Sequence, residues 1–129
     1  MKKNIYIVIF FFVFIFSAFS QHINKEVVYQ EYFANVMYGA TEFRLDDNTR
    51  VDILTEYYAI EVDFATKWAE AIGQALFYAA KTNTRPGILL IMENETDTLY
   101  LERLLLVISE YIYIKIWTIN SYFEYEEIN

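Results

Sequence analysis

The chain has 129 residues, 56% of them apolar and 19% aromatic, and its 18 acidic residues outnumber its ten Lys and Arg. This length indicates a single domain, and the high apolar fraction excludes a disordered chain. The absence of Cys excludes a disulfide scaffold and a thiolate zinc site, and the single His excludes most His-based catalysis. Carboxylates and Lys therefore remain as the candidate catalytic groups.

The first 20 residues have the pattern of a bacterial secretory signal peptide. Lys2 and Lys3 precede an unbroken apolar run over residues 5–16, and Ala18 and Ser20 occupy the two small-residue positions before a cut after Ser20. The run is shorter than the about 20 apolar residues of a membrane-spanning helix. An uncleaved N-terminal anchor is the alternative, and in both cases the domain lies outside the cytoplasm.

Cleavage would leave residues 21–129 as one exported domain, periplasmic or extracellular, without stable membrane insertion. It also removes two of the ten cations, so eight Lys and Arg face 18 acidic residues and the formal charge becomes −10. Proteins that bind nucleic acid usually present a basic surface, because neutralisation of phosphates supplies much of the affinity. The charge therefore opposes a nucleic-acid partner. The sequence leaves the oligomeric state open.

Apolar periodicity divides the exported part into alternating helices and strands. The elements we expect are a helix over residues 25–38, strands over 41–45, 50–55 and 58–64, a helix over 65–81, a strand over 87–92, a helix over 99–110 and a strand over 111–119. The first helix has an apolar face of Val27, Val28, Tyr32, Phe33 and Val36. The continuous apolar run GILLIM (87–92) predicts a central strand buried on both faces. An acidic, frayed tail is expected from residue 120.

This order, α-β-β-β-α-β-α-β, predicts the fold class. Three successive strands favour an antiparallel meander, and the later strand-helix-strand unit requires a parallel, right-handed crossover. The expected architecture is α/β, or more closely α+β, with a mixed sheet covered by helices.

Three acidic residues on two predicted neighbouring strands form the candidate site. Asp52 lies in the strand 50–55, whereas Glu61 and Asp63 are two residues apart and therefore share one face of the strand 58–64. If the two strands form a hairpin, Asp52 approaches Glu61, and the converging carboxylates repel one another unless a cation compensates them. Mg²⁺ (or Mn²⁺) takes carboxylate and water oxygens.

The helix that follows carries Lys67, Ala71, Gln74 and Tyr78 on one stripe. Lys67 stands in its first turn, close in sequence to the two acids of the preceding strand, where it would stabilise charge on a scissile phosphate or hold an attacking water. Each residue alone has a simpler interpretation: acid pairs are common on solvated strand faces, a single Lys is typical of a surface, and a Tyr on a helix stripe is typical of a core.

The segments RVDILT (50–55) and AIEVDFA (59–65) together resemble the PD-(D/E)XK nuclease superfamily, the restriction-endonuclease-like fold. The core of that fold is α-β-β-β-α-β, which matches the predicted order, here extended by a C-terminal helix and strand. The resemblance implies that Asp52 and Glu61 bind the metal.

The segment QALFY (74–78) resembles the Q-x-x-x-Y step of the branch that contains helicase-associated exonucleases. This similarity implies that Gln74 and Tyr78 orient the substrate or a water. The acid that the family carries on its upstream helix would be Glu31, with Glu42 as its rival.

Two positions depart from the family pattern. Asp63 replaces the lysine of the E-x-K step, and Val51 replaces the proline before the first acid. Some members carry the lysine on the following helix, and Lys67 is placed for that role.

Two hypotheses follow. The first is an exported, metal-dependent nuclease in which Asp52 and Glu61 bind Mg²⁺, Asp63 adds a ligand or holds a water, Lys67 supplies positive charge and Gln74 orients the substrate. The implied reaction is in-line attack of a metal-activated water on a phosphodiester. The alternative is a non-catalytic exported derivative of the fold that binds a protein or another ligand, which the acidic charge favours.

Overall fold

The computed structural model describes residues 21–129, and the predicted signal peptide of residues 1–20 lies outside the described residues. In this part of the chain the elements, in order, are α1 (Glu26–Met37), β1 (Ala40–Arg44), β2 (Arg50–Leu54), β3 (Tyr58–Phe64), the 3₁₀ turn Ala65–Lys67, α2 (Trp68–Thr82), β4 (Arg85–Met92), the 3₁₀ turn Glu95–Asp97, α3 (Thr98–Tyr111), β5 (Lys115–Asn120) and β6 (Tyr125–Glu127). None of the helices in the described range is long and apolar enough to cross a bilayer.

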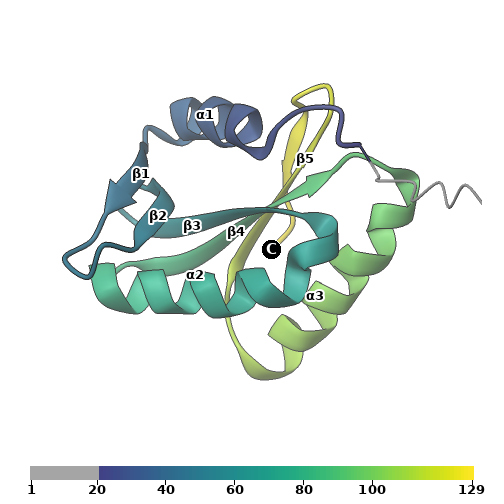
Figure 1. Cartoon of the computed structure of the whole chain (residues 1–129). Helices are drawn as coiled ribbons and strands as arrows, with labels where there is room; N and C mark the ends of the chain where they lie inside the picture. Colours follow the sequence, from purple (N-terminus) through teal and green to yellow (C-terminus); the bar gives the residue numbers. More distant parts are fainter. Residues whose placement is uncertain (1–20) are drawn as a thin grey trace, which may run out of the picture.

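The strands form one six-stranded mixed sheet in the order β1-β2-β3-β4-β5-β6 (Figure 1). β1, β2 and β3 form an antiparallel meander, β3, β4 and β5 run parallel to one another, and β6 returns antiparallel to β5. The helices α2 and α3 make the two parallel connections. The predicted mixed α/β architecture is confirmed.

Helices cover both faces of the sheet, with α1 above it and α2 and α3 below it in Figure 1. On the α1 face, Tyr29 and Phe33 pack against strand residues that include Val62. On the opposite face, Ile88 and Leu90 of β4 pack in a cluster with α2 and α3. β4 is therefore buried on both sides, which explains its uninterrupted apolar sequence.

The buried stripe of α2 consists of small residues. Ala71, Ala75 and Ala79 are each at most 5% exposed, and all three belong to clusters with residues of the sheet. Because Ala has only a methyl side chain, this helix can approach the strands closely. The predicted helix start at residue 65 differs from the structure, in which residues 65–67 form a 3₁₀ turn before α2 begins at Trp68.

The predicted apolar face of the first helix is wrong in part, because Phe33 is buried as expected and Val27 and Val28 are not. α1 buries Tyr29, Gln30, Phe33 and Ala34. Val27 and Val28, which belong to the expected face, are 42% and 40% exposed. Contacts with the sheet, and with the aromatic side chain of Phe123, select the face that carries Tyr29.

The C-terminal prediction is also wrong in two respects. Residues 111–114 are not part of the last predicted strand, because α3 continues to Tyr111 and β5 begins at Lys115. The expected frayed tail instead contains β6. The side chain of Asn120 accepts hydrogen bonds from the backbone N–H groups of Tyr122 and Glu124, both at 3.0 Å, and so closes the turn between β5 and β6.

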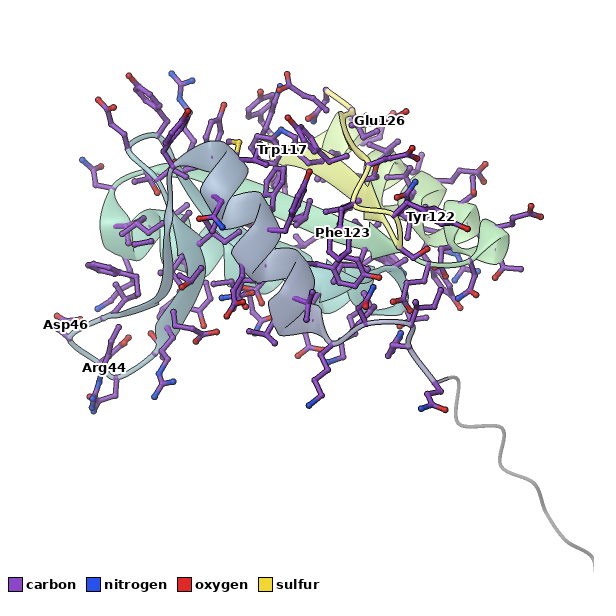
Figure 2. All side chains as sticks on the ribbon, turned by 90° about the horizontal axis from the view of Figure 1, so that it is seen from above. Arg44, Asp46, Trp117, Tyr122, Phe123 and Glu126 are labelled. Atoms are coloured by element: carbon purple, nitrogen blue, oxygen red, sulfur yellow. The ribbon has the colours of Figure 1, made fainter. Side chains whose placement is uncertain are left out.

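Figure 2, viewed from the α1 side, shows the β5–β6 hairpin, with Tyr122, Phe123 and Glu126, beside α1. Arg44 and Asp46 lie at the far tip of the β1–β2 hairpin in the same view.

Candidate functional site

The register between β2 and β3 brings Asp52 to Glu61, as the sequence predicts. Leu54 stands opposite Ala59 and Ile53 opposite Ile60, so the next position in this register pairs Asp52 with Glu61. The regular ladder stops there, because Oδ2 of Asp52 accepts a hydrogen bond from the backbone N–H of Val62 at 2.8 Å. The Asp52 and Glu61 carboxyl groups also interact, because the charge of Asp52 raises the pKa of Glu61.

Glu61 and Asp63 are buried in the layer between β3 and α2. They are 6% and 5% exposed, and they alternate along β3 with Ile60 and Val62, which face α1. Oε2 of Glu61 and Oδ2 of Asp63 are buried and have no hydrogen-bond partner among the described residues. A buried carboxylate oxygen without a partner is costly, so these two atoms require a proton or a cation.

This environment raises the pKa values of all three acids, Asp52, Glu61 and Asp63. Burial, with the nearby charges of Asp52 and Asp63 added, raises the pKa of Glu61 to about 9. Burial is also the main reason why the pKa of Asp63 rises to about 7 and that of Asp52 to about 6; the Val62 N–H opposes the rise at Asp52. Without a cation, Glu61 therefore holds a proton at neutral pH.

A fourth acid, Glu26, joins this group and was not identified from the sequence. It is the first residue of α1, its charge raises the pKa of Asp52, Glu61 and Asp63, and burial raises its own pKa. Glu31, the acid expected on this helix, is exposed. An acid in the first helical turn is common for its favourable interaction with the helix dipole, so the sequence carries no specific signal for Glu26.

Glu42, the rival of Glu31, lies at the edge of the group. The β1–β2 register places it opposite Asp52, and its charge raises the pKa of Asp52. Its φ of 51° is unusual for a non-glycine residue in a strand. The buried side chain of Gln30 holds both positions, since its Nε2 donates to Oε1 of Glu42 at 3.0 Å and to the carbonyl oxygen of Asp52 at 2.8 Å. Gln30 is a second site residue that the sequence did not indicate.

Lys67 supplies positive charge beside the acids. It is exposed at the end of the 3₁₀ turn that follows β3, and its charge lowers the pKa of Asp63 and of Glu26. Within residues 21–129 it forms no ion pair of its own. Its ammonium group is therefore available to a ligand as well as to the carboxylates.

Two residues of α2 complete the surroundings. Tyr78 is half-buried, and burial together with the charges of Glu61 and Asp52 raises its pKa. It also packs against the cluster of Val51 and Ala79, so it has a core contact in addition to its proximity to the acids. Gln74 is half-buried on the same stripe, one turn before Tyr78.

The carboxylates of the site are the candidate ligands of a divalent cation. The described residues contain no group of three or more His, Cys, Asp or Glu side chains placed to hold a metal ion. The structure therefore does not bring Asp63 into a ligand set with Asp52 and Glu61. The remaining pair consists of hard oxygen donors, and Mg²⁺ is commonly bound through one or two carboxylates plus waters and substrate phosphates. The pair fits that kind of site and does not fit a cage made only of protein ligands.

No family model, curated protein or solved structure matches the chain.

Proposed function

We propose that the chain is an exported, Mg²⁺- or Mn²⁺-dependent nuclease that hydrolyses phosphodiester bonds on a restriction-endonuclease-like core. The observation that carries the proposal is the pair of half-buried Asp52 and buried Glu61, which lies next to an available lysine and contains a carboxylate oxygen without a partner. The order from α1 to β4, with β4 parallel to β3, supports a core of this type.

Each residue has a defined task in this proposal. Asp52 and Glu61 would hold the cation, which when bound lowers the pKa of a water and polarises the phosphate. Asp63, whose pKa is about 7, would hold and deprotonate the attacking water. Lys67 would stabilise the charge that develops on the phosphate oxygens, and Gln74 and Tyr78 would orient the substrate.

The acidic surface favours a second candidate function. Residues 21–129 carry a formal charge of −10, which disfavours approach of a polyanion. The second candidate is a non-catalytic derivative that binds a protein or another ligand through the same fold. The nuclease remains the better-supported function for two reasons. Salt screens charges beyond about 10 Å, which weakens the repulsion between the acidic domain and a polyanion. A binding module, moreover, has no need for buried carboxylates without partners.

Nuclease assays on the purified exported protein test the proposal. Single- and double-stranded DNA and RNA are incubated with Mg²⁺, with Mn²⁺ or with EDTA. The variant Asp52→Ala removes a proposed ligand, and the matched control Glu102→Gln removes one exposed acid of α3. We expect metal-dependent cleavage by the parent and by the control only. Absence of cleavage by the parent on every substrate would leave the non-catalytic candidate in its place.

A further inference from the structure

The strand β2 changes its inward face at Asp52. Val51 and Ile53, on either side of Asp52, are both fully buried. Val51 packs in a cluster with Ala79 of α2, whereas Ile53 packs in a cluster with Phe33 of α1, on the opposite face of the sheet. Residues two apart in a regular strand share one face. The backbone of β2 is therefore irregular at Asp52.

Pairing with both neighbouring strands is interrupted at the same level. Toward β3, regular pairing stops at Ile53, and the backbone N–H of Val62 donates to Oδ2 of Asp52 instead. Toward β1, residues pair on both sides of Glu42, but Glu42 itself is left out and has a φ of 51°. A non-glycine residue keeps this left-handed conformation only where its surroundings determine it. The break between the strands therefore requires a contact from another element.

Gln30 of α1 provides that contact. The residue is 2% exposed, and its Nε2 donates to the carbonyl oxygen of Asp52 at 2.8 Å and to Oε1 of Glu42 at 3.0 Å. A carbonyl oxygen can only accept, so the nitrogen of the amide must face it. Loss of this donor would leave the Asp52 carbonyl short of a buried partner and favour its return to regular pairing. The Gln30 amide therefore stabilises the irregular backbone at Asp52.

The irregular backbone directs the carboxylate of Asp52. In a regular strand a side chain stands out from one face of the sheet. The Asp52 carboxylate instead lies against the backbone of β3, at the N–H of Val62, which directly follows Glu61. This displacement brings a carboxylate of β2 to the position next to Glu61.

We propose that Gln30 is a positioning residue of the cation site, which holds the backbone of Asp52 so that the carboxylates of Asp52 and Glu61 bind Mg²⁺ or Mn²⁺ together. Gln30 acts only through Asp52 and binds neither the cation nor the substrate. Its contribution is therefore to the affinity for the metal and not to the chemistry of the metal-loaded protein. This inference rests on the proposed nuclease function.

The test measures Mn²⁺ binding in Gln30→Met, a variant that keeps the length of the side chain and removes its N–H groups. Titration calorimetry gives the Kd for Mn²⁺, and nuclease rates over a series of Mn²⁺ concentrations give the concentration for half activation. We expect both values to rise about 10- to 100-fold, the usual cost of losing a group that orients a metal ligand. At saturating Mn²⁺ kcat should return to within about 3-fold of the parent value.

Tyr29→Phe is the matched control on the same helix. Tyr29 is also fully buried, and its hydroxyl donates at 2.6 Å to Glu93, which follows β4. Mn²⁺ affinity in this variant should stay within about 2-fold of the parent, because independent sites do not couple. Urea unfolding in EDTA confirms that each variant is folded under the assay conditions. If Gln30→Met does not fold, Gln30→Asn replaces it, because an amide one methylene shorter does not reach the Asp52 carbonyl.

A Mn²⁺ affinity in Gln30→Met equal to that of the parent or of Tyr29→Phe would overturn the role of Gln30 and leave the nuclease function standing. A loss of kcat that saturating Mn²⁺ does not restore would also overturn it. A parent that neither binds Mn²⁺ nor cleaves nucleic acid would overturn the nuclease function, and the role of Gln30 with it.

Discussion

The buried carboxyl of Glu61 predicts an unusual pH dependence of stability for the metal-free protein. In the folded chain its pKa is about 9, against an ordinary value of 4.5. The unfolded chain therefore releases this proton at much lower pH than the folded chain does. The stabilisation is complete below the ordinary pKa and is lost as the pH rises toward the folded pKa, because over that window the folded state binds more protons.

The magnitude follows from the size of the window. Each pH unit between the two pKa values removes about 1.4 kcal/mol from the free energy of unfolding. Raising the pH from about 5 to about 7 should therefore cost the parent about 3 kcal/mol through Glu61 alone. Glu61→Gln keeps the shape of the side chain and removes its ionisable proton. The free energy of unfolding of this variant should therefore fall by about 3 kcal/mol less than that of the parent over the same pH interval.

Urea unfolding in EDTA at several pH values measures the effect. Glu102→Gln changes the net charge equally at an exposed position and should follow the parent, which separates the buried group from general repulsion in an acidic domain. A parent that gains stability between about pH 5 and about pH 7, or a Glu61→Gln variant with the same pH slope as the parent, would refute the argument that Glu61 is protonated in the fold.

Three further predictions concern the metal, the lysine and export. Millimolar Mn²⁺ should raise the melting temperature of the parent, because a ligand that binds only the folded state stabilises it. Thermal unfolding of Asp52→Ala and Glu61→Ala should show no such rise. A parent whose melting temperature does not respond to Mn²⁺ would contradict the metal site. Lys67→Ala should change the free energy of unfolding by less than about 0.5 kcal/mol, keep the Mn²⁺ response and lower the nuclease rate about 100-fold. Lys67→Arg should restore little of that rate, since a planar guanidinium does not replace a compact ammonium. Parental turnover in Lys67→Ala would disprove the role of Lys67. Intact-mass measurement of the exported protein should give a chain that begins at Gln21, whereas a chain that begins at Met1 would indicate an uncleaved anchor.

The approach of Asp52 to Glu61 could be predicted from the sequence because it depends on local patterns. Alternation defines the two strands, and a short connection between them pairs them as a hairpin. Their register then follows from the connection, and with it the partner of each residue. The same local rules place Asp63 and Glu61 on one face.

The acid on α1 could not be predicted in this way. The orientation of a helix about its axis depends on what it packs against, and the sequence of α1 has apolar residues on more than one side. The structure turns Tyr29 inward and leaves Val28 half-exposed, and this choice brings Glu26 to the site and leaves Glu31 in solvent. The role of Gln30 escapes prediction for the same reason, since its partners come from β1 and β2.

The alanine stripe of α2 couples the packing of the domain to the chemistry of its site. A larger side chain at Ala71 or Ala75 would require the helix to move away from the sheet, because a filled core does not accept added volume without displacement. The same movement would carry α2, and with it Gln74, away from β3, the strand that holds Glu61. We therefore expect a larger residue at either alanine to alter the spacing between α2 and the acids of β3, although neither alanine carries a polar group.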